Sequence, residues 1–185
     1  MVHSPQQRNQ WTKNRNNYTG QITDESYQGI LGYHNPIWKY VINRYDDLNG
    51  NLCPITVVGY TAIPLAIEFS QWGFPVTYIT ETYEGVKKAK ADCEIHSGKF
   101  KDFYYSDFIN DCPGSKLIIF VGIIDKLKKD EMFDFIDMLL RRGREIIFSV
   151  RNDRDWRNIF SGKYITNVSK YSDQQFCLIT LKENE

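Results

Sequence analysis

Four positions of this 185-residue chain combine a residue type and a place along the sequence that suit ligand chemistry. Gly59 lies in VVGYTAIP (57–64), between a β-branched run and a helical pattern. A glycine at such a turn lets a ligand approach the backbone closely. Glu81 follows at about the 20-residue spacing at which nucleotide-binding turns are followed by an acid that binds the ribose. Asp107 and Asp125 come after two later apolar runs.

Each of these three carboxylates has two interpretations. Glu81 either accepts hydrogen bonds from a ligand or is an ordinary surface glutamate. Asp107 either binds a ligand or caps the turn that follows it, since aspartate is a preferred N-cap residue. Asp125 either orients a nucleophile or acts as a base, or else caps the next segment.

The surrounding sequence alternates between strand and helix patterns. Short apolar or β-branched runs predict strands at 55–60, 76–80, 101–108, 116–123, 145–151, 164–171 and 176–182. Helical spacing predicts helices at 36–50, 62–73, 83–93, 130–143 and 153–160. This alternation is typical of a parallel sheet with helices on both faces. The last two strands are joined by SDQQ, which is too short for a parallel crossover, so we expect an antiparallel hairpin there.

Composition excludes several classes of protein. Basic and acidic residues number 23 each, which argues against a general nucleic-acid coat but leaves room for a local basic patch. The four cysteines lack zinc spacing, so we expect free thiols and no metal site. No secretory leader pattern or run long enough to span a bilayer is present, so we expect a cytoplasmic protein without a membrane partner.

The first 26 residues differ from the rest of the chain. Residues 1–26 are polar and rich in Asn and Gln, which predicts a flexible arm or lid before a single domain at 27–185. The arm carries basic residues beside aromatic ones: Arg8, Trp11, Lys13, Arg15 and Tyr18. This mixture fits either a grip on single-stranded nucleic acid or a solvated tail.

Five strand–helix units that end in an antiparallel hairpin, over about residues 36–182, resemble the class I S-adenosylmethionine-dependent methyltransferase family. The resemblance implies an α/β, Rossmann-like fold with a mainly parallel seven-stranded sheet, and S-adenosylmethionine as cofactor. In the family's glycine pattern, [DE]-x-G-x-G-x-G, Gly59 matches the first glycine. Val57 replaces the acid, and Thr61 and Ile63 replace the other two glycines.

The resemblance also implies roles for residues at the first four strand ends. Glu81 would bind the ribose hydroxyls, Asp107 would accept from the adenine amine, and Asp125 would be the catalytic group at the mouth of the fourth strand. Further cofactor contacts would come from Gly59, Tyr60, Thr61, Phe108 and Gly122.

Three functions remain open. The first is a methyltransferase, whose acceptor is a small molecule or a nucleic acid, because neither D-P-P-Y nor P-C is present at the fourth strand to indicate which. The second is a methyltransferase-like protein without catalysis that acts as a binding or scaffold protein. The third is an NAD-type dinucleotide binder, since GYTAIP loosely imitates G-x-G-x-x-G. The sequence does not indicate the oligomeric state.

Overall fold

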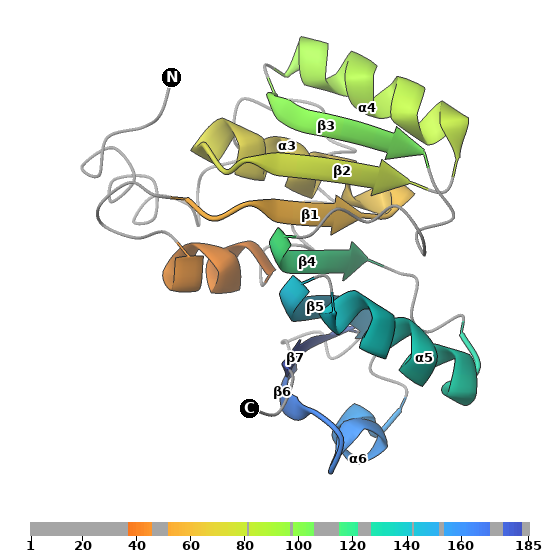
Figure 1. Cartoon of the computed structure of the whole chain (residues 1–185). Coiled ribbons are helices and arrows are strands. Elements are labelled where there is room, and N and C mark those ends of the chain that lie inside the picture. The colour runs from red at the N-terminus through yellow and green to blue at the C-terminus, as the bar shows by residue number, and fades with distance from the viewer. Residues whose placement is uncertain are drawn as a thin grey trace.

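The computed structural model has one twisted sheet with helices packed against it (Figure 1). The structure describes residues 37–45, 52–80, 82–96, 98–105, 115–121, 127–141, 143–151, 154–170 and 176–182. Within these described ranges, seven strands lie in the order β3-β2-β1-β4-β5-β7-β6. Their bounds are β1 Ile55–Val58, β2 Val76–Thr80, β3 Phe100–Tyr105, β4 Ser115–Val121, β5 Gly143–Arg151, β6 Ile165–Lys170 and β7 Phe176–Lys182.

Strands β1 to β5 pair in parallel, so their carboxyl ends lie along one edge of the sheet (Figure 1). At the centre, Val58 of β1 is level with Ile79 of β2 and with Phe120 of β4. All four residues of β1 are buried, as expected for a parallel strand covered on both faces. The predicted α/β class with a parallel sheet is confirmed. At the other end, β7 lies between β5 and β6 and pairs antiparallel with both.

The helices form a layer on each face of the sheet. They are an unlabelled helix over 37–45, α3 Ile63–Trp72, α4 Tyr83–Ile95, α5 Lys129–Leu140 and α6 Trp156–Phe160. Neighbouring strand residues point to opposite faces, so Val57 packs with α3, α4 and the 37–45 helix, whereas Val58 packs with α5 and α6. None of the described helices has the length and apolarity needed to cross a bilayer.

The structure confirms the predicted end of one helix and corrects the predicted end of another. Gly73 ends α3 as predicted, in the left-handed region at φ 106°, where its N–H donates to the carbonyls of Phe69 and Ser70. The helix predicted over 130–143 ends earlier, at Leu140, and that part of the prediction was wrong. Gly143 instead opens β5, because it pairs with Ser115 of β4 and extends the central sheet.

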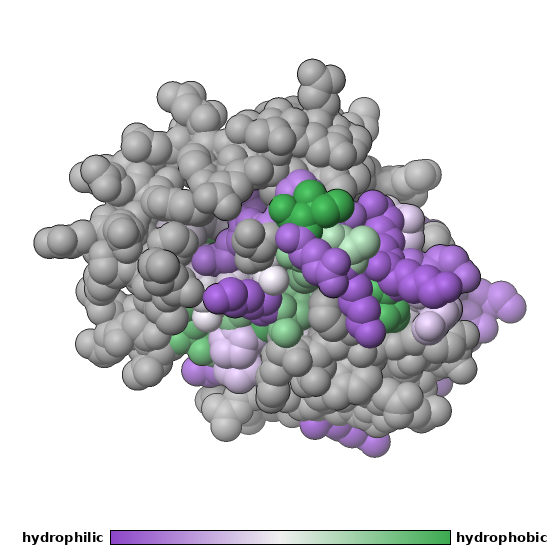
Figure 2. Space-filling view, turned by 90° about the horizontal axis from the view of Figure 1, so that it is seen from above, coloured by the Kyte–Doolittle hydropathy of each residue, from purple (hydrophilic) through white to green (hydrophobic). Residues whose placement is uncertain are grey.

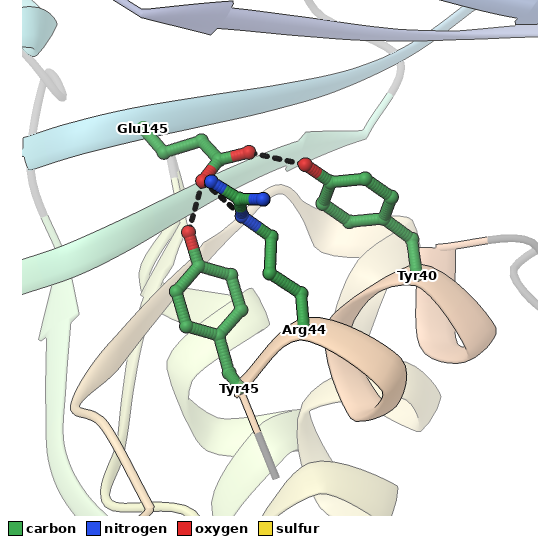
Figure 3. A network of polar contacts seen from close by, with 4 residues as sticks. All are labelled: Tyr40, Arg44, Tyr45 and Glu145. Carbon is green, nitrogen blue, oxygen red and sulfur yellow. Dashed lines mark hydrogen bonds and ion pairs between the residues drawn. The ribbon is translucent and has the colours of Figure 1, made fainter. Parts of the chain in front are cut away.

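A buried carboxylate anchors the 37–45 helix to the sheet (Figure 3). Glu145, at the amino end of β5, is only 2% exposed. It accepts hydrogen bonds from the Tyr40 and Tyr45 hydroxyls and from Arg44 Nε, the last at 2.9 Å. Burial and the bond to Glu145 raise the pKa of Tyr45 well above its usual range, so this phenol stays a donor at physiological pH. Trp38 of the same helix packs edge-on against Trp72 of α3, at 5.4 Å between ring centroids.

Replacing Glu145 should therefore destabilise the whole domain. Glu145→Ala leaves three donors without this acceptor. We expect the free energy of unfolding to fall by about 2–4 kcal/mol. This figure counts the Arg44 bond at less than its full strength, because the Arg44 side chain is partly solvated. Urea denaturation measures the loss. Glu94→Ala, at an exposed position of α4, is the matched control and should change stability by less than about 0.5 kcal/mol. Equal unfolding midpoints for the two variants would contradict the anchoring role.

Candidate functional site

The glycine turn lies where the order of the strands reverses. From β1 the chain runs outward to β2 and β3, and then returns to β4 on the other side of β1. Ligands of open α/β sheets bind outside the carboxyl ends of the strands at such a reversal. Gly59 directly follows Val58, the last residue of β1, so the turn sits at this point (Figure 1).

The backbone conformation at position 59 requires a glycine. Its φ of 118° and ψ of 143° fall in a region that residues with a side chain rarely adopt. Its N–H donates to the carbonyl of Ile79 at 3.0 Å, which ties the turn to β2. Its carbonyl accepts from the N–H of Ala62, also at 3.0 Å. The single glycine left from the family pattern is therefore the one whose conformation the turn cannot do without.

Two other predicted residues follow in a short 3-10 helix, η2 (Tyr60–Ala62). Tyr60 is 44% exposed, Thr61 is exposed, and Ala62 is fully buried. The helix α3 begins next, and its first turn contains Pro64 and no acidic residue. The positive end of the α3 dipole is thus not offset by a carboxylate from this turn. Gly59, Tyr60 and Thr61 are brought together at the carboxyl edge.

The two apolar replacements in the family pattern serve packing. Val57 and Ile63 are 0% and 1% exposed and belong to the core on the α3 face. Neither side chain reaches a ligand from there. The N–H and the carbonyl of Gly59 are both bonded within the protein, so a polar contact from this turn has to come from the exposed Tyr60 and Thr61.

The end of β2 is held against the start of α4. The Oγ1 of Thr82 accepts from the N–H of Gly85 at 3.0 Å and caps the helix. Thr80 is fully buried, and a Cβ added at Gly85 would lie 2.5 Å from its Oγ1. Gly85 therefore allows α4 to approach the strand end more closely than any larger residue would. Glu81 comes between Thr80 and Thr82 and itself lies outside the described residues.

A second exposed aromatic residue stands near this edge. Tyr83 opens α4 and is 57% exposed, with Lys87 Nζ 4.7 Å from its ring centroid. Seen from above, the described surface is mostly hydrophilic with small apolar areas (Figure 2). This agrees with the exposed Lys87, Lys88 and Lys90 on the outer side of α4.

Five of the predicted site residues follow the described ends of β2, β3 and β4 in the sequence. Glu81, Asp107, Phe108, Gly122 and Asp125 lie outside the described residues, as does the predicted arm over 1–26. The strands that lead to them end together, because Tyr105 of β3 is level with Thr80 of β2, and Phe120 of β4 with Val58 of β1. Their roles stay predictions.

Two of the four cysteines, Cys53 and Cys93, are not candidate nucleophiles. Cys53 and Cys93 are free thiols. Burial raises the pKa of each to about 11, so both stay protonated at neutral pH. A protonated thiol is a poor nucleophile.

Sequence reasoning missed Tyr78. Its hydroxyl donates to the carbonyl of Gly59 at 3.0 Å from a fully buried position on β2. One signal was available: a tyrosine within the buried run VTYIT must find a partner for its hydroxyl. The identity of that partner depends on the pairing of β2 with β1, which the sequence does not state.

Comparisons with known proteins agree on the fold. No family model and no curated protein sequence matches the chain. Solved structures do match. Magnesium protoporphyrin IX methyltransferase from Synechocystis PCC 6803, crystallised with bound S-adenosylmethionine, is 16% identical with a TM-score of 0.63, over 88% of this chain and 86% of that one.

Two further structures have the same fold. The N-methyltransferase NodS from Bradyrhizobium japonicum WM9 is 12% identical with a TM-score of 0.63, over 89% of this chain and 100% of that one. The ribosomal protein L11 methylase from Lactobacillus delbrueckii subsp. bulgaricus is 13% identical with a TM-score of 0.58, over 71% of both chains. At such identities the likeness establishes the fold alone. The chain has the α/β, Rossmann-like fold of the S-adenosylmethionine-dependent methyltransferases.

Proposed function

We propose that this chain binds S-adenosylmethionine at the carboxyl edge of β1 to β4 and is a methyltransferase. The observation that carries the proposal is the Gly59 turn, held in a glycine-only conformation at the reversal of strand order. Structures of this fold crystallised with S-adenosylmethionine or with S-adenosylhomocysteine support it. The proposal includes the finer form of this fold, in which the described residues make a seven-stranded sheet with an antiparallel β6–β7 hairpin.

The proposal assigns the residues at this edge by what their chemistry can do. The backbone of Gly59, with Tyr60 and Thr61, faces the cofactor next to the α3 N-terminus. Glu81 accepts from the ribose hydroxyls. The adenine amine is bound by Asp107, with Phe108 and Gly122 beside the cofactor.

Catalysis asks little more of the protein. S-adenosylmethionine supplies a methyl group already activated by its sulfonium, so the protein mainly has to hold the acceptor in line and exclude water. Asp125 is the proposed group that orients the acceptor or accepts its proton. By their names, the similar structures act on a porphyrin and on a ribosomal protein, so the acceptor is not a property of the fold. A small molecule and a nucleic acid are the two acceptor classes to test.

Ligand binding tests the proposal directly. We expect S-adenosylmethionine and S-adenosylhomocysteine, at ~100 times their dissociation constants, to add about 2.7 kcal/mol of stability and to raise the melting temperature by about 5–10 °C. NAD at the same concentration is the control and should give no shift. A shift with NAD alone would indicate a dinucleotide binder. No shift with any of the three would favour a scaffold protein.

Methyl transfer itself is measured by incubating the protein and methyl-labelled cofactor with separate pools of RNA, DNA and small metabolites.

A comparison of two positive-φ glycines, Gly59 and Gly162, separates an effect on binding from an effect on stability. Gly59→Ala should cost about 1–3 kcal/mol of unfolding free energy and weaken S-adenosylmethionine binding, because alanine rarely adopts this φ. Gly162→Ala is the matched control: φ there is 83°, and nothing lies within 4 Å of an added Cβ. It should cost about 1–2 kcal/mol and leave affinity unchanged. Urea denaturation and calorimetry measure both. Equal loss of affinity in the two variants would remove Gly59 from the site.

The adenine contact has its own test. Asp107→Ala should weaken binding of S-adenosylmethionine by about 1–3 kcal/mol, if its carboxylate accepts from the amine. Asp130→Ala, at an exposed position in the first turn of α5, serves as the control. Calorimetry on the two variants gives the comparison. Wild-type affinity in Asp107→Ala would exclude this residue from the cofactor site.

A further inference from the structure

A tyrosine from β2 reaches the glycine turn from inside the protein. The ring of Tyr78 is 0% exposed and lies 5.8 Å from the ring of Phe100, centroid to centroid. Its hydroxyl donates to the Gly59 carbonyl, which also accepts from the Ala62 N–H, each at 3.0 Å. A carbonyl oxygen has two lone pairs, so both acceptor positions of this carbonyl are used within the protein.

These bonds set the orientation of the next peptide group. In a planar trans peptide, the carbonyl of one residue and the N–H of the next point in opposite directions. No cis peptide occurs among the described residues. Because Tyr78 holds the Gly59 carbonyl inward, the N–H of Tyr60 points away from the buried phenol. Tyr60 itself is partly exposed at the carboxyl edge, on the side where the cofactor is proposed to bind.

We propose that Tyr78 is a positioning residue, which orients the Gly59–Tyr60 peptide so that the Tyr60 N–H faces the cofactor. The inference rests on the proposed function. It names a residue that contacts no ligand and acts only through the turn. An oriented backbone N–H beside a helix N-terminus suits an anionic group such as the carboxylate of the cofactor's amino-acid part.

The bond from the Tyr78 hydroxyl to the Gly59 carbonyl is related to the loss of two glycines from the family's pattern. Glycines at positions 61 and 63 would leave the turn free to take its shape around the ligand, but Thr61 and Ile63 stand there. Ile63 is committed to the core. The turn therefore keeps one conformation, and the Tyr78 hydroxyl helps to fix it from the neighbouring strand. A preorganised donor costs no reordering when the ligand binds.

Tyr78→Phe tests the inference because it removes the hydroxyl and keeps the ring. Tyr164→Phe is the matched control. It removes a hydroxyl that donates to Asp137 at 2.6 Å. This bond joins the segment between α6 and β6 to α5, away from the glycine turn. We expect the dissociation constant of S-adenosylmethionine to rise about tenfold in Tyr78→Phe. In Tyr164→Phe it should stay within about twofold of wild type, at a similar loss of stability.

Amide NMR provides a readout that does not need the cofactor. In the ligand-free protein, Tyr78→Phe should shift the amide resonances of Tyr60 and Ala62, whose peptide groups the lost bond controls. Unchanged resonances, or unchanged cofactor affinity in a protein that binds it, would overturn the inference. An equal loss of affinity in Tyr164→Phe would overturn it too. If the wild type binds neither S-adenosylmethionine nor S-adenosylhomocysteine, the proposed function fails, while the resonances still decide whether Tyr78 holds the peptide.

Discussion

The architecture of the domain follows from the parallel pairing of β1 with β2 on one side and with β4 on the other. A strand paired on both edges and buried on both faces needs helices above and below, and α3 and α5 supply them. Parallel neighbours also place their carboxyl ends at one edge. The reversal of strand order at β1 lies at that edge, next to Gly59. The location of the candidate site is thus a consequence of the central pairing.

The two edges of the sheet are used differently. At the amino end of β5, Glu145 is buried among two tyrosines and Arg44 and ties the 37–45 helix to the sheet. At the carboxyl edge, Tyr60, Thr61 and Tyr83 are exposed beyond the ends of β1 and β2. The Glu145 anchor and the residues that could meet a ligand therefore occupy opposite ends of the strands. A loss of stability at Glu145 and a loss of binding at Gly59 should be separable by mutation for this reason.

The glycine turn has a well-defined geometry although its sequence matches the family's glycine pattern at only one glycine. By sequence, loss of the acid and of two glycines weakens the match to a cofactor-binding turn. In the structure, Val57 and Ile63 have become part of the core, while Gly59 keeps the one conformation that needs glycine. The bonds that fix this turn come from Ile79, Ala62 and Tyr78. Two of these three residues belong to β2, which is remote in sequence from the motif itself.

From the sequence alone we predicted the α/β class, the parallel sheet and Gly73 as the end of α3, because hydrophobic periodicity and glycine punctuation are local properties. The sequence also identified Gly59 as the turn residue. It misplaced the end of the 130–143 helix, because the pairing of Gly143 with β4 overrides a local glycine signal. The roles of Tyr78, Gly85 and Glu145 emerged from the packing of distant segments. Each of these residues contacts a partner that strand pairing or helix docking brings near. A local sequence pattern does not indicate which distant residue that partner will be.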